Sequence, residues 1–157
     1  MIDPEELMRL AIAKAREGVR AGQSPFGCAI ASDHEVLAVA HNTVVATTDI
    51  TAHAEVNALR EGCKKTQAIF LQGCLVATTC EPCPMCMSAL HWARVETVHY
   101  GATIGDAASA GFNELRLPAA DLLRSGGSRV SLIGKTLHDE CRDLFAEWSL
   151  AANRTVY

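Results

Sequence analysis

Two short segments carry side chains that could bind a metal ion and move protons. Residues 53–55 read His-Ala-Glu, and residues 82–86 read Pro-Cys-Pro-Met-Cys. An imidazole and two thiolates are preferred zinc ligands, and three protein ligands leave the fourth position of a tetrahedral ion open to water. The sequence therefore predicts one Zn²⁺ bound by His53, Cys83 and Cys86. Such an ion lowers the pKa of its bound water from ~15.7 toward ~7.

The local structure expected around these residues supports that role. Each segment lies at the start of an expected helix, and Pro84 fits the first helical position. Cys83 and Cys86 are three residues apart, so a helix presents them on one face. The positive end of a helix also favours thiolate over thiol. Glu55 follows His53 by two residues, and at an irregular helix start it can reach metal-bound water as a general acid and base.

The cysteines leave three other interpretations open. Cys80 is the obvious fourth ligand for a closed, structural zinc site, but a closed site gives Glu55 no role. A non-catalytic zinc module for protein interactions and a redox-active C-x-x-C pair are the other two. The chain has seven cysteines and no export signal, which favours a reducing, cytoplasmic location over disulfide bonding. We interpret the remaining four as small buried hydrophobic residues: Cys28, Cys63, Cys74 and Cys141.

Size and composition indicate a single globular domain over residues 1–157. Hydrophobic residues make up 49% and charged residues 20% of the 157, which excludes an intrinsically disordered chain. The apolar stretches are too short to span a membrane. The net charge of −4 disfavours sequence-independent binding to nucleic acid and favours a small, uncharged or cationic substrate.

Hydrophobic periodicity predicts alternating strands and helices. We expect a polar loop over residues 42–49, a long loop with one helical turn over 101–120, and a flexible turn over 125–128. About five strands with helices on both faces form a three-layer α/β/α sandwich. The expected strands are 28–31, 35–41, 73–78, 95–100 and 130–133. The expected helices are 4–22, one beginning near Thr51, 83–93, and an amphipathic helix from Leu137.

Several motifs together resemble the cytidine deaminase-like zinc deaminase superfamily over nearly the whole chain. Residues 25–27 (PFG), 49–58 (DITAHAEVNA) and 80–86 (CEPCPMC) are similar to its purine-acting branch, in which the first ligand is His rather than Cys. Residues 89–94 (ALHWAR), residues 106–112 (DAASAGF) and the terminal Tyr157 resemble small bacterial guanine deaminases.

This resemblance implies a mixed five-stranded sheet, a homodimer and a nucleobase pocket. It implies that residues 137–157 are exchanged between subunits, so that Tyr157 closes the partner's site. Asn42 would hydrogen-bond the purine, and Phe26 or Trp92 would pack on its face. Glu114 stands where the family has an Asp that meets the purine edge, and the backbone N–H of Ala54 or Cys83 would also bind substrate.

The implied reaction is hydrolytic deamination of guanine to xanthine and ammonia, with Glu55 carrying the protons. The longer reach of Glu114 leaves another aminopurine, cytosine, a triazine or a pterin as alternative substrates. A tRNA adenosine deaminase is the nearest rival, but residues 137–157 hold two arginines against four acidic residues. Structural roles also remain open: a turn for Asn42, core packing for Phe26 and Trp92, and a solvated loop charge for Glu114.

Overall fold

A computed structural model describes residues 2–157. The strands are β1 (Gly27–Ala31), β2 (Val36–His41), β3 (Leu75–Cys80), β4 (Thr97–Ala102) and β5 (Ser131–Ile133). The helices are α1 (Pro4–Arg20), α2 (Val44–Thr47), α3 (Ala54–Thr66), α4 (Pro84–Trp92), α5 (Ile104–Ser109), α6 (Ala119–Gly126) and α7 (His138–Ser149).

The strands form one mixed sheet in the order β2-β1-β3-β4-β5. β1 pairs antiparallel with β2 and with β3, whereas β3, β4 and β5 are parallel. The connections explain this arrangement, because a tight turn joins β1 to β2 and helices lie between the parallel strands. The structure confirms the predicted five-stranded mixed sheet.

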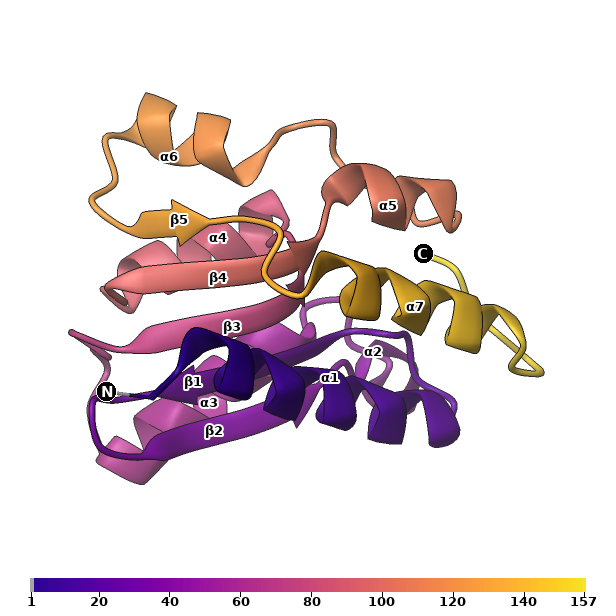
Figure 1. Ribbon diagram of the computed structural model, residues 1–157, viewed down its shortest axis with the longest axis horizontal. Helices are drawn as coiled ribbons and strands as arrows, with labels where there is room; N and C mark the ends of the chain where they lie inside the picture. The colour runs from indigo at the N-terminus through magenta and orange to yellow at the C-terminus, as the bar shows by residue number, and fades with distance from the viewer. Residues whose placement is uncertain (1) are drawn as a thin grey trace.

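Helices cover both faces of the sheet, as Figure 1 shows, with α1 and α7 in front and α3 and α4 behind. Neighbouring residues of a central strand point to opposite faces, so both must be apolar. In β1, Ile30 packs on the α3 and α4 side, and Ala29 packs on the α1 and α7 side. Val76 and Ala77 alternate in the same way along β3. The predicted three-layer α/β/α sandwich is therefore confirmed.

The structure differs from the sequence prediction mainly in the second half of the chain. β3 and β4 each begin two residues later than expected, and α2 occupies part of the expected loop over 42–49. α6 covers residues 119–126, where we expected the end of a loop and a flexible turn. Its buried residues, Ala119 and Leu123, are too few for a clear helical period, and two glycines at its end suggested a turn.

The helices and the cysteines bear on two further features predicted from the sequence, which are the lack of a membrane span and the burial of four thiols. Within residues 2–157, none of the helices combines the length and apolar character that a membrane span requires. All seven cysteines fall in this range and are free thiols. Cys28, Cys74 and Cys141 are buried as predicted, and Cys63 is partly exposed.

Candidate active site

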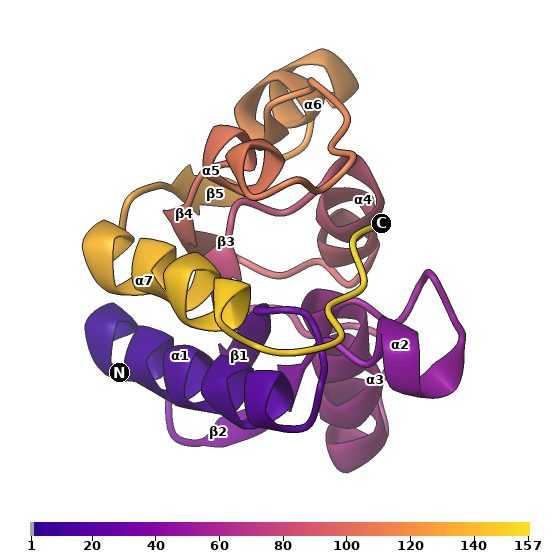
Figure 2. The same ribbon diagram turned by 90° about the vertical axis from the view of Figure 1, so that its right-hand side faces the viewer.

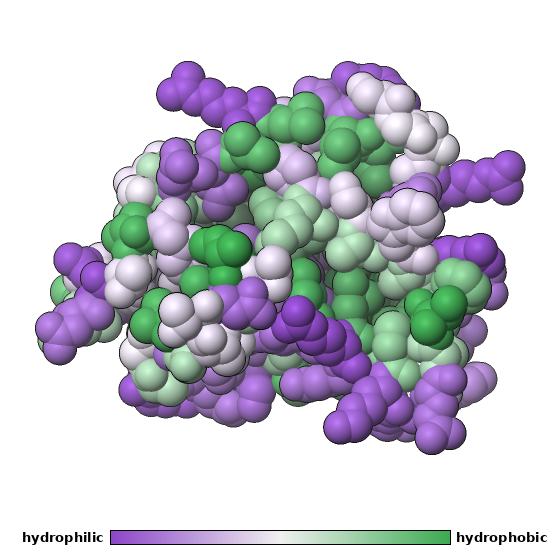
Figure 3. Space-filling model, turned by 180° about the vertical axis from the view of Figure 1, so that it is seen from behind, coloured by the Kyte–Doolittle hydropathy of each residue, from purple (hydrophilic) through white to green (hydrophobic). Residues whose placement is uncertain are grey.

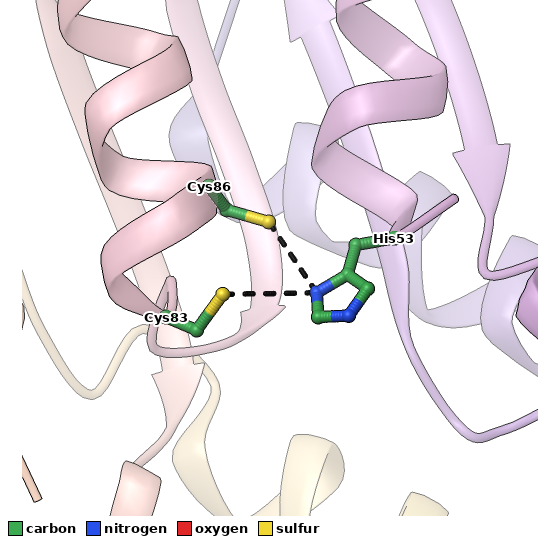
Figure 4. Close-up of side chains that lie close together, drawn as sticks. All are labelled: His53, Cys83 and Cys86. Carbon is green, nitrogen blue, oxygen red and sulfur yellow. Dashed lines mark hydrogen bonds between the residues drawn. The ribbon is translucent and has the colours of Figure 1, made fainter. Parts of the chain in front are cut away.

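The three predicted zinc ligands meet where α3 and α4 begin, on the same face of the sheet. His53 precedes α3 as its N-cap residue, Cys83 precedes α4, and Cys86 lies in the first turn of α4. His53 Nδ1 is 3.7 Å from Cys83 Sγ and 3.5 Å from Cys86 Sγ (Figure 4). Both N-cap residues have an extended backbone, which turns their side chains toward the neighbouring helix start.

This geometry fits zinc. With Zn–N and Zn–S bonds of about 2.1 and 2.3 Å, tetrahedral coordination separates the nitrogen and sulfur atoms by about 3.6 Å. The three donor atoms lie within 4.8 Å of one another, and they are the metal-ligand cluster found among residues 2–157. Cys80 is not part of it, because its thiol donates to the carbonyl of Thr103 at 3.6 Å. The structure thus disfavours the closed site with Cys80 as fourth ligand.

The electrostatics of the cluster favour ligation. A hydrogen bond from Cys86 lowers the pKa of the Cys83 thiol to about 4, against the effect of burial, and His53 contributes in the same direction. The hydrogen bond to Cys83, together with burial, raises the pKa of Cys86 well above its usual range. Burial alone would lower the pKa of His53, but the hydrogen bond to Cys83 and the charge of Glu55 raise it. Because the Cys83 thiol ionises so readily, the cluster carries a negative charge that favours a cation.

Glu55 lies beside the cluster in the first turn of α3 and is 6% exposed. Burial is the main cause that raises the pKa of its carboxyl group, and the Cys83 thiolate adds to it. Thr78, near the end of β3, donates a hydrogen bond from Oγ1 to Glu55 Oε1 at 3.0 Å. A buried carboxyl group with a raised pKa and one fixed oxygen is suited to accept and release protons during a reaction.

A cavity of about 310 Å³ opens in front of Glu55 and the ligand cluster. This volume lies at the small end of ligand pockets. Among the described residues, three carboxylates and neither lysine nor arginine line the cavity. The lining residues are Phe26, Asn42, Ile50, His53, Glu55, Cys80, Glu81, Cys83, Pro84, Met85, Phe112, Asn113, Glu114, Leu115 and Tyr157.

Asn42 and Phe26 both reach this cavity. The side-chain carbonyl of Asn42 accepts from the backbone of Val44 at 3.1 Å, so the expected turn role is present. Its Nδ2 donates to Tyr157 Oη at 2.7 Å, which places the same side chain in the cavity wall. Phe26 meets Phe112 edge to face, with ring centroids 5.0 Å apart.

The C-terminal tail closes one side of the cavity of its own chain. It leaves α7 and ends beside the start of α4 (Figure 2). The backbone N–H of Asn113 donates to the Tyr157 carbonyl at 3.0 Å, and the Tyr157 ring packs edge to face on Phe112. Glu114 follows on the same wall, where burial raises the pKa of its carboxyl group. Exchange of residues 137–157 between subunits stays a prediction.

A family comparison agrees with this geometry. Residues 1–102 match the model of the cytidine and deoxycytidylate deaminase zinc-binding region. The chain belongs to this deaminase family. The matched region contains His53, Glu55, Cys83 and Cys86, and the last two with His53 form the cluster that could hold a metal ion.

Curated relatives of the deaminase include enzymes for free bases and for tRNA. A guanine deaminase of Bacillus subtilis (strain 168) is 46% identical over 111 residues, which are 70% of this chain and 71% of that protein. A tRNA-specific adenosine deaminase of Aquifex aeolicus (strain VF5) is 37% identical over 98 residues, 62% of this chain and 65% of that protein.

Solved structures support the fold of the deaminase. The structure of a guanine deaminase from Nitrosomonas europaea superposes with a TM-score of 0.87 over 96% of this chain and 87% of that one. The two sequences are 24% identical, so this likeness concerns the fold.

Two residues predicted for the pocket of the deaminase do not line it with their side chains. Trp92, the last residue of α4, is 77% exposed and borders a separate hollow with Met87 and Leu122. It therefore neither packs on a base in this pocket nor belongs to the core. Ala54 is fully buried and does not line the cavity, so the contact of its backbone N–H with substrate stays a prediction.

Sequence reasoning missed Thr78, Glu81 and Phe112 as parts of the deaminase site. Thr78 and Thr79 are buried hydroxyls in a strand whose other residues are apolar, which is a signal that polar partners are near. Phe112 lies at the end of the motif at residues 106–112 and contacts Phe26 and Tyr157. These contacts join residues at least 23 positions apart, so spacing in the sequence does not reveal them.

Proposed function

We propose that this deaminase converts guanine and water to xanthine and ammonia. The observation that carries the proposal is an open three-ligand cluster beside a buried carboxylate, at the bottom of a pocket of about 310 Å³. The 46% identity to a guanine deaminase supports the choice of base. An aromatic residue and a second carboxylate in the wall supply the contacts that a flat, hydrogen-bonding base needs.

His53, Cys83 and Cys86 would hold the zinc ion, which when bound supplies the Lewis acidity that makes water a stronger acid. Glu55 takes a proton from the attacking water and gives it to N3 of guanine while C2 gains the oxygen. It then takes the remaining hydroxyl proton and delivers it to the amino group, which leaves as ammonia. Proton transfer by a positioned group of this kind contributes typically about 10²–10⁴-fold.

The wall residues would hold guanine against this carboxylate. The Asn42 amide has a second hydrogen beyond the one it donates to Tyr157, and it would donate that hydrogen to an acceptor of the purine. Glu114 accepts from the N–H groups of the base, Phe26 packs on its face, and the backbone N–H of Ala54 donates to it. Cytosine has a smaller ring system than guanine, so it would make only some of these contacts.

A substrate panel tests the proposal. Ammonia release is measured with the zinc-loaded protein on guanine, adenine, cytosine, guanosine, melamine, a pterin and tRNA. We expect guanine to give the highest kcat/KM, and Glu55→Ala provides the blank for contaminating activity. A preference for any other member of the panel would contradict the assignment of guanine and leave the zinc chemistry in place.

Editing of adenosine in tRNA is the second candidate, because of the 37% identity to the Aquifex enzyme. An RNA substrate requires cationic groups for its phosphates. The three carboxylates of the cavity lining, Glu55, Glu81 and Glu114, oppose a polyanion near the pocket. Deamination of tRNA in the panel, with a salt dependence of binding, would favour this candidate.

We also propose a homodimer in the cytoplasm with one zinc ion per subunit. The face formed by α3 and α4 shows apolar side chains among hydrophilic ones (Figure 3). Trp92, the last residue of α4, and Ile69, in the segment after α3, are exposed. Exposed aromatic and apolar residues of this kind occur where subunits meet. Light scattering coupled to size exclusion measures the subunit number, and a mass of one chain at micromolar concentration would contradict the dimer.

A further inference from the structure

One wall of the cavity is a segment without regular structure between two short helices. Residues 110–118 connect α5 to α6, and four consecutive members of this segment, Phe112 to Leu115, line the cavity. Phe112 is buried and anchors the start of this segment, whereas Leu115 is 66% exposed and has no comparable anchor in the core. The position of the wall beyond Phe112 therefore depends on how the flanking helices are held.

Glu81 holds the start of the helix on each side of this segment with one carboxylate. Its Oε2 accepts from the backbone N–H of Ile104 at 3.1 Å, and its Oε1 accepts from that of Ala119 at 2.9 Å. Ile104 is the first residue of α5, and Ala119 is the first residue of α6. The starts of the two helices therefore lie close together, because one carboxylate reaches the first residue of each.

These contacts are strong for a simple physical reason. The first N–H groups of a helix have no partner within the helix, and the helix dipole favours a negative charge there. The N-cap residue of α6 is Pro118, which makes no side-chain capping bond, so Glu81 provides the acceptor that α6 itself lacks. The backbone of Glu81 is held in turn, because its N–H donates to Ala102 at 2.8 Å.

Glu81 also connects this wall to the metal cluster. It follows β3 directly and precedes Cys83 by two residues. Both of its oxygens are engaged by backbone amides, although the side chain borders the cavity. The carboxylate that contacts the base in our proposal, Glu114, lies on the segment between the two helices whose starts Glu81 holds.

We propose that Glu81 is a positioning residue that sets the distance of the Glu114 wall from the reacting centre. This inference depends on the proposed function, because it assigns the binding of guanine to that wall. Glu81 acts through Glu114 on substrate affinity, and it leaves the proton transfers of Glu55 unchanged.

A double-mutant cycle on the zinc-loaded enzyme tests this role. Glu81→Gln keeps the size of the side chain but offers an N–H group where one helix amide needs an acceptor. We expect KM for guanine to rise about tenfold, with kcat within about threefold and zinc content unchanged. Combined with Glu114→Gln, it should raise KM by no more than about twofold beyond Glu114→Gln alone, because both changes remove the same contact.

Asp106→Asn is the matched control. Asp106 also stabilises the start of α5, because its carboxylate accepts from Thr103 N at 2.9 Å, and it does not line the cavity. We expect this variant to lower the melting temperature without changing KM. A KM increase equal to that of Glu81→Gln would show a general effect of α5 stability and would overturn the proposal.

Other outcomes are also decisive. Multiplicative effects of Glu81→Gln and Glu114→Gln on KM would overturn the proposal, as would a loss of kcat or zinc in Glu81→Gln. Glu81→Asp, with its shorter reach, is the second variant and should also raise KM; absence of folded protein from both variants would show a purely structural role. If the unmodified enzyme does not deaminate guanine, the proposed function fails first, which separates the two failures.

Discussion

The two sides of the cavity are built in different ways. The side that holds His53, Cys86 and Glu55 consists of the first turns of two helices packed on the central strands, with Cys86 fully buried. The opposite side consists of residues 110–118 and the C-terminal tail, which contact each other through Asn113 and Tyr157. The reaction thus depends on rigid elements, and substrate binding depends on segments that distant contacts hold in place.

This contrast leads to different effects of substitution on the two sides. Changes on the helix side should reduce zinc content or kcat, and changes on the opposite side should mainly raise KM. The four predictions below test this separation.

The largest effect is expected from loss of the metal. Cys86→Ala removes one of three ligands, so zinc content should fall from one per chain to near zero, and activity should fall by more than about 10⁴-fold. Metal analysis and ammonia release measure both effects. Chelation of zinc from the unmodified enzyme should give the same loss, and restored activity on adding Zn²⁺ is the control. Full activity without metal would contradict the role assigned to the three ligands.

Glu55→Gln should lower kcat by about 10²–10⁴-fold, because the amide cannot carry the protons. The side chain is buried and the replacement has the same shape, so zinc content should stay at one per chain. Steady-state kinetics with metal analysis checks this prediction. Substantial activity in this variant would refute the role of Glu55.

Thr78→Val should lower kcat by about 10–100-fold, because a hydrogen bond to a charged group contributes about 1.5–3 kcal/mol. The hydroxyl that holds Glu55 Oε1 is lost, while the volume of the side chain stays similar. Thr78→Ser should recover most of the activity. Thr79→Val is the matched control: its hydroxyl accepts from Gly27 N at 3.0 Å, so thermal stability should fall while kcat is retained.

Tyr157→Phe should give the smallest effect, a rise in KM of about 2–10-fold at nearly constant kcat. The variant removes the hydroxyl that accepts from Asn42 and keeps the ring that packs on Phe112. Kinetics on guanine measures the split between KM and kcat. An equally large loss of kcat would show that the wall takes part in the reaction itself and would end the proposed separation.

The sequence predicted the rigid side of the site much better than the opposite wall. His53, Cys83 and Cys86 lie at helix starts whose local residues determine the backbone, and their chemistry as zinc ligands indicates that they converge. The strands were predicted for a similar reason, since their apolar runs are buried on both faces.

The parts that were missed depend on contacts between distant residues. α6 is a short helix whose start is capped by a carboxylate 38 positions away, a contact that leaves no local signal. Trp92 has the composition of a pocket residue, but the orientation of α4 directs it to solvent, and helix orientation is set by packing on the sheet. The role of Thr78 likewise appears once β3 and α3 are packed together.

The double contact of Glu81 has a practical consequence for protein engineering. Because one side chain holds the starts of both helices that flank residues 110–118, these residues form a segment whose flanking helices stay in place when its interior changes. Libraries that vary its four cavity-facing positions can therefore search for enzymes acting on other heterocycles without redesign of the metal centre.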